Sequence, residues 1–372
     1  MSERPVHGAA VRLHHVTRRW GTSVALDRVT IDVAAGSFTV LLGPSGCGKS
    51  TCLRLIAGLD EPNDGRVEID GRDVTPVPPA ARGVAMVFQS YALFPHLNVG
   101  ENILFGLRAR NVGKAERTRR LRDAAEMLGI GHLLDRRPAQ LSGGQQQRVA
   151  LGRAVVAQTP VCLMDEPLSN LDAQLRAEMR REVLALQRRL GITMIYVTHD
   201  QTEAMSMADQ VVLLRDGRVE QDAPPDRIYA HPETTFAASF IGTPPMNLLP
   251  LERTAHGLTI AGTTTPLMTG RPDHRGPLLA GIRPETLRLA AAGIEARVTH
   301  SEFLGADTIV ACAVGAGAAR LLARLPGRAR LQPGDRVAFA LDAPPHIFDA
   351  TTSRRIVHAA ETPTRTATPV ST

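Results

Sequence analysis

The stretch FTVLLGPSGCGKSTCLRLIAGL, residues 38–59, decides the fold. Its first five residues, FTVLL at 38–42, are an apolar run with the length of a strand buried on both faces. GPSGCGKS at 43–50 fits the pattern G-x-x-x-x-G-K-[ST] without a mismatch, and a helical pattern follows at 51–59. In this order the segments form a phosphate-binding loop, because glycines let backbone N–H groups converge on phosphate oxygens and the helix dipole adds positive charge.

The phosphate loop predicts roles for individual residues. We expect the ammonium of Lys49 to reach the β- and γ-phosphates of a nucleotide and the hydroxyl of Ser50 to ligate Mg²⁺. The alternative is a glycine-rich turn that binds nothing, which the flanking strand and helix disfavour. The residues predicted to bind the nucleotide here are Gly43, Pro44, Ser45, Gly46, Cys47, Gly48, Lys49, Ser50 and Thr51.

The phosphate loop lies in a chain that alternates apolar runs with helical patterns from about residue 11 to 220, which predicts a largely parallel α/β sheet. Two further runs, VTIDV at 29–33 and RVEID at 66–70, alternate apolar with polar residues and predict an additional antiparallel layer. The runs that predict buried strands are 38–42, 84–88, 161–165, 194–198 and 210–214.

Polar residues end or directly follow three of these strands. Asp165 and Glu166 end VCLMDE, His199 follows YVT, and Gln89 follows VAMVF. We expect Asp165 to hold Mg²⁺ through water and Glu166 to activate the attacking water as general base. His199 is expected to donate to the γ-phosphate, and Gln89 to sense the attacking water or Mg²⁺; the alternatives are a structural histidine and a loop glutamine without a role. The predicted catalytic residues are Lys49, Gln89, Glu166 and His199, and the predicted metal-binding residues are Ser50, Gln89 and Asp165.

Trp20 is the only tryptophan of the chain and precedes the first expected strands, in VTRRWG. Two interpretations stay open for it. One is packing in the core, and the other is a platform on which an adenine ring stacks.

A second helix start shaped for an anion occurs in QLSGGQQQRVALGRA, residues 140–154. Ser142 is expected to cap this helix, while Gly143 and Gly144 expose backbone N–H groups at its start. One chain needs a single cradle for its own nucleotide. If two copies pair head to tail, the loop from Leu141 to Gln145 of one copy closes over the γ-phosphate held by the other. Ser142, Gly143, Gly144 and Gln145 are therefore predicted nucleotide contacts, and hydrolysis then requires both copies.

Composition limits the setting in which the chain works. The 372 residues carry a net charge of +6, partly from the arginine-rich stretch 107–122, which is either a solvated helix face or a face that works close to a membrane. The four cysteines have no CxxC spacing, so a zinc knuckle is not indicated. No secretory signal and no apolar run of about 18 residues is present, so we expect a cytosolic protein or a peripheral membrane subunit.

The character of the sequence changes after about residue 222. A proline-rich stretch, 222–250, is typical of a linker, and short strand-like runs broken by Gly, Pro and Asp over about 247–356 predict a small all-β barrel. Residues 357–372 are low in complexity and are expected to be disordered.

Together these motifs resemble those of the ATPase subunit of an ABC transporter. Seven elements occur in that family's order, and they are Trp20, the loop 43–50, Gln89, the signature LSGGQ at 141–145, Asp165–Glu166, SNLD at 169–172, and His199. Residues 90–107 and the downstream β region narrow the resemblance to importers of maltose-type sugars and glycerol-3-phosphate. FIGTPPMNLLP at 240–250 and FLGAD at 303–307 are most similar to the glycerol-3-phosphate importers. One departure is Gln146, which stands where the family usually has an arginine.

The resemblance implies an α/β P-loop ATPase domain over 11–235, with a helical subdomain at about 90–155, then an OB-like, TOBE-type regulatory domain over 236–356. It implies ATP and Mg²⁺ as ligands and a homodimer beneath two membrane-spanning permease subunits, on the cytoplasmic face of the inner membrane. A periplasmic binding protein would deliver the solute, and residues 90–138 would receive the permease's coupling helices.

The sequence leaves three alternative functions open. The same machine with another cargo, such as maltose, another oligosaccharide, a polyamine or ferric ion, is the nearest alternative. A soluble ABC ATPase acting on DNA or ribosomes usually has two ATPase domains or a long coiled coil, and this chain has one signature and no sustained heptads; no nucleic-acid partner is expected. A simple P-loop kinase needs no second anion cradle.

Overall fold

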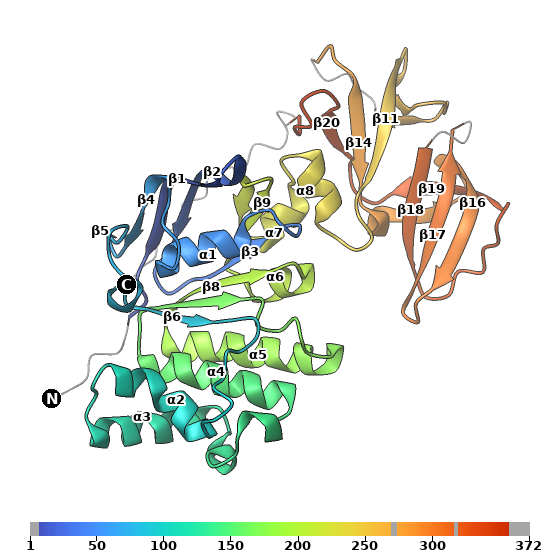
Figure 1. Ribbon diagram of the computed structural model, residues 1–372. Coiled ribbons are helices and arrows are strands. Elements are labelled where there is room, and N and C mark those ends of the chain that lie inside the picture. The colour runs from blue at the N-terminus through green and yellow to red at the C-terminus, as the bar shows by residue number, and fades with distance from the viewer. Residues whose placement is uncertain (1–6, 269–273, 316–318, 357–372) are drawn as a thin grey trace, which may run out of the picture. The chain divides into compact units, whose positions relative to one another are not determined.

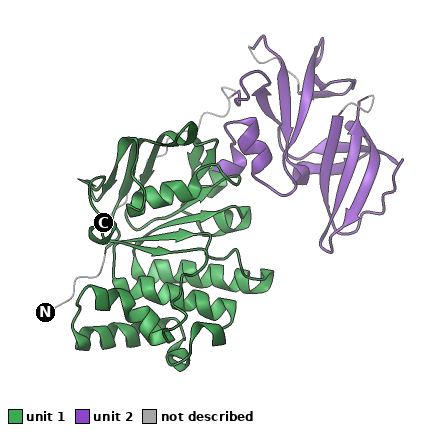
Figure 2. Ribbon diagram, viewed as in Figure 1, with its two compact units in different colours: residues 1–227 green, residues 228–372 purple. Residues whose placement is uncertain are grey.

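The computed structural model describes residues 7–268, 274–315 and 319–356, so the predicted disordered tail lies outside the described residues. The chain forms two compact units, residues 1–227 and residues 228–372 (Figure 2). No helix within the described ranges combines the length and apolar character needed to cross a membrane.

The centre of the first unit is a six-stranded sheet with the strand order β10-β9-β3-β8-β7-β6 (Figure 1). Five strands are parallel, and β10 pairs antiparallel with β9 at one edge. All five parallel strands predicted from apolar runs are confirmed. The bounds are β3 Phe38–Leu42, β6 Val84–Val87, β7 Val161–Asp165, β8 Thr193–Thr198, β9 Gln210–Arg215 and β10 Arg218–Ala223.

A second, antiparallel sheet has the order β2-β1-β4-β5, which confirms the predicted extra layer. The apolar faces of both sheets pack with α1 (Lys49–Ala57) in one hydrophobic core. The antiparallel sheet contributes Leu13 to this core, α1 contributes Leu53, and the six-stranded sheet contributes Val197. The prediction that Trp20 precedes the first strands is wrong, because Trp20 is the last residue of β1. The bounds are β1 Val11–Trp20, β2 Ser23–Val33, β4 Asp64–Ile69 and β5 Arg72–Asp73.

The α-helices that come between β6 and β7 in the sequence pack on one another (Figure 1). In α3, Arg119 and Arg120 both pair with Glu116, and these guanidinium groups lower the pKa of Glu116 to about 2. The arginine-rich stretch thus carries ion pairs along its own helix, which favours the solvated-face interpretation. The bounds are α2 Val99–Ala109, α3 Lys114–Met127, α4 Gly143–Ala157, α5 Ala173–Leu190 and α6 Gln201–Met207, with 3₁₀ turns at Pro79–Ala81, Gly131–Leu133 and Pro138–Gln140.

The proline-rich stretch predicted as a linker instead contains two helices, α7 (Pro225–Ala230) and α8 (Thr235–Phe240). Proline is tolerated in a helix's first turn, where its missing N–H has no intrahelical acceptor. The side chain of Thr234 accepts from the N–H of Ala237 and so caps α8. Pro225 therefore begins α7, and a threonine cap begins α8, so this proline-rich stretch is partly helical and the linker prediction is wrong.

From residue 247 onward the second unit confirms the all-β expectation with two five-stranded antiparallel sheets. Their orders are β13-β12-β11-β14-β20 and β15-β19-β16-β17-β18, and both contribute to one core that includes Leu249, Val298 and Phe339. The bounds are β11 Asn247–Thr254, β12 Gly257–Ile260, β13 Pro266–Met268, β14 Leu278–Ile282, β15 Leu287–Ala290, β16 Ile294–Phe303, β17 Asp307–Val314, β18 Ala319–Pro326, β19 Arg336–Leu341 and β20 His346–Asp349, with a 3₁₀ turn at Pro284–Thr286.

Candidate nucleotide-binding site

The carboxyl ends of the parallel strands bring the predicted site residues to one edge of the sheet. Gly43 follows β3, Asp165 is the last residue of β7, His199 follows β8, and Gln89 lies two residues beyond β6. Because β6, β7, β8 and β3 run parallel in adjacent positions, these ends share an edge (Figure 1). Ligands of open α/β sheets bind outside this edge.

The phosphate loop is shaped by two glycines that no other residue replaces easily. A Cβ on Gly43 would lie 2.3 Å from the carbonyl oxygen of Leu214, and one on Gly48 would lie 2.6 Å from that of Ala25. Gly48 caps α1 with φ of 104°, in the left-handed region that glycine tolerates. The first intrahelical bond runs from Cys52 N–H to Gly48 O at 2.9 Å, so the preceding N–H groups of α1 have no acceptor within the helix. The loop and helix start therefore offer the converging donors that a phosphate needs.

Lys49 is the first residue of α1 and is buried. Its Nζ donates to the carbonyl oxygens of Gly43 and Pro44, at 2.8 Å each. The ammonium is thereby held against the carbonyl groups at the start of the phosphate loop. A fixed positive charge in this position suits a di- or triphosphate.

Ser50 and Asp165 meet directly. Ser50 Oγ donates to Asp165 Oδ1 at 2.8 Å, joining α1 to the end of β7. Burial raises the pKa of Asp165, the Ser50 hydrogen bond lowers it, and the neighbouring charge of Glu166 raises it further. A hydroxyl and a carboxylate side by side are oxygen donors of the kind that Mg²⁺ prefers. Within the described residues no group of three or more His, Cys, Asp or Glu side chains is placed to hold a metal ion.

Glu166 is held in a strained backbone conformation next to His199. Its φ is +42°, in the left-handed region where a non-glycine residue is uncommon. Its N–H donates to the carbonyl oxygen of Val197 at 3.1 Å, which ties the turn after β7 to β8. Oε2 of Glu166 lies 3.2 Å from Nδ1 of His199. The imidazole is 58% exposed and the carboxylate 21%, so a solvent-facing histidine stands beside a shielded carboxylate.

Gln89 is connected to Glu166 through Ser169, for which the sequence predicted no role of its own. Ser169 Oγ donates to the carbonyl oxygen of Glu166 at 2.9 Å and accepts from Nε2 of Gln89 at 3.3 Å. Nδ2 of Asn170 also donates to the carbonyl oxygen of Gln89, at 3.2 Å. The loop after β6 is therefore bonded to the turn that carries Glu166.

Arg176, in the first turns of α5, was missed altogether. Its guanidinium donates to Leu171 O at 2.9 Å and pairs with Asp200 at 3.7 Å. It thus links the segment 169–172 to the residue after His199. An arginine four residues after Asp172, which caps α5, was the available sequence signal.

Glu203, also missed, is a buried carboxyl behind His199. It accepts from Thr198 Oγ1 at 2.6 Å and from Tyr196 Oη at 2.9 Å. Thr198 Oγ1 in turn accepts from the N–H of Asp200 at 3.0 Å. The residues on both sides of His199 are therefore anchored to one network, which fixes where the imidazole emerges.

The buried carboxyl of Glu203 is expected to make the stability of the fold depend on pH. Burial raises its pKa in the folded chain, although hydrogen bonds from Thr198 and Tyr196 lower it. The stability contributed by the protonated carboxyl is complete below its unfolded pKa, about 4.3, and is lost as pH rises through the raised folded pKa. Glu203→Gln stays neutral, so we expect the stability advantage of the unmodified chain over this variant to shrink as pH rises from about 4 toward neutrality.

Denaturant unfolding of both proteins across this range measures the difference. Asp216→Asn, at a side chain that is 87% exposed, is the matched control. A Glu203→Gln difference that does not change with pH would contradict the account.

The second predicted anion cradle begins α4. Ser142 caps the helix as predicted, accepting from Gln145 N–H at 3.4 Å, while its own N–H donates to Gln145 Oε1 at 3.0 Å. A Cβ on Gly144 would lie 3.0 Å from a methyl of Leu175, so the helix start packs closely on α5. Gln146, the departure from the family pattern, donates to Pro138 O at 3.1 Å and braces the preceding turn. Among the described residues no hydrogen bond or ion pair joins 141–145 to 43–51.

Trp20 is 47% exposed, so the interpretation that it packs in the core is wrong. The Arg18 guanidinium lies over its ring, 5.1 Å from the ring centroid. The Trp20 ring is thus partly exposed at the end of β1, as a stacking platform for an adenine ring requires.

Comparison with known proteins places this arrangement in a family. Residues 26–169 match the model described as ABC transporter, and residues 280–346 match the TOBE domain. An sn-glycerol-3-phosphate import ATP-binding protein of Cereibacter sphaeroides is 46% identical over 94% of this chain and 100% of the relative. A sulfoquinovosyl glycerol transport ATP-binding protein of Agrobacterium fabrum is 44% identical over 94% of this chain and 99% of the relative.

Solved structures agree in fold. A dimeric bacterial ABC transporter cassette aligns with a TM-score of 0.53 at 32% identity, covering 58% of this chain and 98% of that one. A dimeric cassette in a post-hydrolysis state bound to ADP and phosphate gives a TM-score of 0.52, also at 32% identity, with the same coverage of each chain. The chain therefore belongs to the ABC transporter family, in the group of importer ATP-binding subunits, and is a nucleotide-binding ATPase.

Proposed function

We propose that two copies of this chain pair head to tail and hydrolyse ATP at sites that both copies complete. One observation carries the proposal: a single chain presents two separate helix starts suited to anions, at Gly48 and at Ser142. The similar cassettes whose titles describe dimers support it. Ser142, Gly143, Gly144 and Gln145 of one copy then face the γ-phosphate held by the loop 43–51 of the other.

Within such a site the residues divide the work. Lys49 and the N–H groups from Gly46 to Thr51 bind the phosphates, and Trp20 stacks on the adenine. Ser50, Asp165 and Gln89 hold Mg²⁺, which when bound neutralises charge on the phosphate oxygens.

The neighbouring side chains of Glu166 and His199 carry out the chemistry. Glu166 accepts a proton from the attacking water, and His199 donates to the γ-phosphate. The hydrogen bonds from Gln89 to Ser169 and from Ser169 to the carbonyl oxygen of Glu166, together with the Glu203 network, hold this pair in position.

We infer the partners from the first unit's surface. A cavity of about 260 Å³ is lined by apolar Phe94, Ile103 and Phe105 and by Arg110 and Arg153. Phe105 is 45% exposed beside it. An apolar cleft whose lining includes two arginines suits a helix of a permease subunit. A place beneath two permease subunits puts the chain at the cytoplasmic face of the inner membrane, with a binding protein delivering solute outside.

We propose sn-glycerol-3-phosphate as the solute, because that name recurs among relatives matched over nearly their whole length. A second candidate is a sulfonated glyceryl glycoside, suggested by the relative named for sulfoquinovosyl glycerol transport. The ATPase and C-terminal domains, proposed over 11–235 and 236–356, do not touch the solute.

Uptake measurements test this assignment. A strain lacking the gene is expected to lose uptake of labelled sn-glycerol-3-phosphate and to regain it with the intact chain. Glu166→Gln should not restore uptake, whereas Glu178→Gln, at an exposed carboxylate on α5, should restore it fully. Unchanged glycerol-3-phosphate uptake in the deletion strain, with loss of another solute, would reject this cargo and leave the ATPase assignment standing.

A further inference from the structure

The turn that carries Gln89 has a backbone conformation that needs support from outside. It spans residues 89–92 and begins two residues beyond β6. Tyr91 and Ala92 have φ of 61° and 47°, and both values lie in the left-handed region where non-glycine residues are uncommon. Such conformations persist only where the surrounding structure fixes them. Contacts from other elements must therefore determine where Gln89 lies.

The turn is held from two sides. At its start, Gln89 is bonded to Ser169 and Asn170, in the segment before α5. At its end, a guanidinium Nη1 of Arg153 donates to the carbonyl oxygen of Ala92 at 2.5 Å. Arg153 lies near the end of α4. Of these contacts, the one from Arg153 is the one that ties the turn to α4.

The side chain of Tyr91 anchors the turn by packing. It is 5% exposed, and its hydroxyl is buried with no hydrogen-bond partner among the residues that the structure describes. Apolar packing is non-directional, whereas a hydrogen bond requires a defined orientation of donor and acceptor. The bond from Arg153 therefore fixes the direction of the Ala92 carbonyl, which the burial of Tyr91 leaves open.

Arg153 is well placed to make a strong bond to this carbonyl. No carboxylate pairs with it in the described part of the chain, so its charge is not used elsewhere. It lines the cavity of about 260 Å³ beside Phe94 and Phe105, and burial lowers its pKa. An arginine stays charged even so. Hydrogen bonds from a charged donor are stronger than neutral ones, the more so where the surroundings are apolar.

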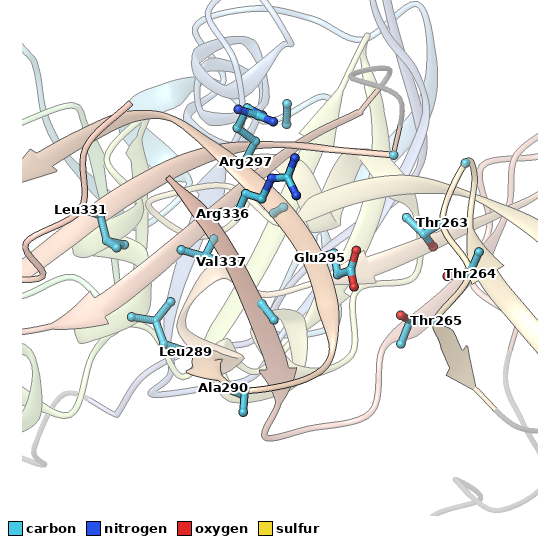
Figure 3. A pocket seen from close by; sticks show the side chains of 16 residues that line it. Thr263, Thr264, Thr265, Leu289, Ala290, Glu295, Arg297, Leu331, Arg336 and Val337 are labelled. Atoms are coloured by element: carbon cyan, nitrogen blue, oxygen red, sulfur yellow. The ribbon is translucent and has the colours of Figure 1, made fainter. Parts of the chain in front are cut away.

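The arginines of the larger cavity in the second unit form no comparable bond. Figure 3 shows that cavity, of about 780 Å³, with Arg297 and Arg336 in its lining. Both are exposed, and among the described residues their one contact with a carbonyl oxygen runs from Arg297 to Gly334, at 3.4 Å. Lining a cavity does not by itself bring an arginine onto the backbone, so the 2.5 Å bond from Arg153 to Ala92 is a specific feature of the first unit.

We propose that Arg153 is a positioning residue for hydrolysis, which holds the turn 89–92 so that the amide of Gln89 meets Mg²⁺ and the attacking water. The inference rests on the proposed role of Gln89 and adds the contact that sets its position. Arg153 acts through the carbonyl of Ala92, three residues after Gln89. Loss of this bond leaves the phosphate loop intact, so ATP still binds and the defect falls on kcat.

Steady-state ATPase kinetics on the full chain test the proposal. Arg153→Met keeps a long side chain beside the apolar cavity but has no donor, and Arg153→Gln has an amide too short to reach Ala92. We expect both variants to lower kcat roughly tenfold or more, because a small misplacement of a positioned group is costly. ATP affinity, followed by Trp20 fluorescence, should stay within about twofold, since the phosphate loop grips the nucleotide.

Arg153→Lys is the rescuing variant. Lysine keeps a charged donor of similar length, and the contact with Ala92 uses a single N–H, so the planar fork of arginine is not needed. We expect kcat within about threefold of the unmodified chain. Arg181→Met, at an exposed arginine of α5, is the matched control and should keep normal turnover.

A double-mutant cycle with Gln89→Ala separates positioning from a general loss of structure. If Arg153 acts through Gln89, Arg153→Met should lower kcat by no more than about twofold once Gln89→Ala is present. A general structural defect would instead multiply with the loss caused by Gln89→Ala, and it would weaken ATP binding as well.

Four results would each overturn the proposal: normal kcat in both Arg153→Met and Arg153→Gln, normal kcat in Gln89→Ala, failure of Arg153→Lys to restore kcat, or multiplicative losses in the double variant. The turnover of the unmodified chain and its loss in Glu166→Gln do not depend on Arg153. They report separately on the proposed hydrolysis site, so a failure of that proposal is distinguishable from a failure of this one.

Discussion

Glu166→Gln is expected to bind ATP and to pair, yet to hydrolyse ATP roughly 10²- to 10⁴-fold more slowly, the usual contribution of a general base. The amide has the carboxylate's shape and can still meet Nδ1 of His199, now 3.2 Å from Oε2. It cannot accept a proton from water. Binding energy is therefore kept while the proton acceptor is lost, so the defect falls on kcat. Phosphate release under saturating ATP measures this rate, and fluorescence of the single tryptophan, Trp20, measures binding.

The matched control is Glu178→Gln, which removes a carboxylate whose side chain is 51% exposed on α5. Its turnover should equal that of the unmodified chain. Turnover of Glu166→Gln within a few-fold of normal would remove Glu166 from the role of base.

Ser142→Asp is expected to lower ATPase activity by about 10²- to 10³-fold, comparable to losing a donor that stabilises developing charge. Aspartate caps a helix as well as serine does and favours the positive end of the helix dipole, so α4 remains stable. The melting temperature should stay within about 3 °C, the shift that about 1 kcal/mol produces in a domain of this size. The added carboxylate instead repels a triphosphate presented to this helix start.

ATP binding by the separated chain should be unchanged in this variant, because the phosphate loop that grips the nucleotide is intact. Ser142→Asn, a neutral cap, is the control and should lose far less activity. Normal turnover of Ser142→Asp would mean that no phosphate approaches Ser142.

Most of the sheet and the phosphate loop could be predicted because their signals are local. An apolar run such as 38–42 specifies a buried strand by itself, and the following glycines are required by contacts with Leu214 and Ala25 that any residue with a Cβ would violate. The helix start at Ser142 was equally local, since a cap is formed within four residues.

Features set by distant parts of the chain could not be predicted. Glu203 lies in α6 and bonds side chains of β8, and nothing in its own surroundings distinguishes it from an exposed helical glutamate. The bond from Gln89 to Ser169 spans 80 residues. The exposure of Trp20 depends on where β1 ends.

Complementation between two inactive variants tests the shared site most directly. One protein carries Lys49→Ala and the other Ser142→Asp, so each alone is expected to be inactive. In a head-to-tail mixed dimer, the intact Lys49 of one copy meets the intact Ser142 of the other at one of the two sites. Mixing equal amounts should restore roughly a quarter of normal ATPase activity, if half of the dimers are mixed and each has one working site. A mixture as inactive as its components, although mixed dimers form, would contradict the account.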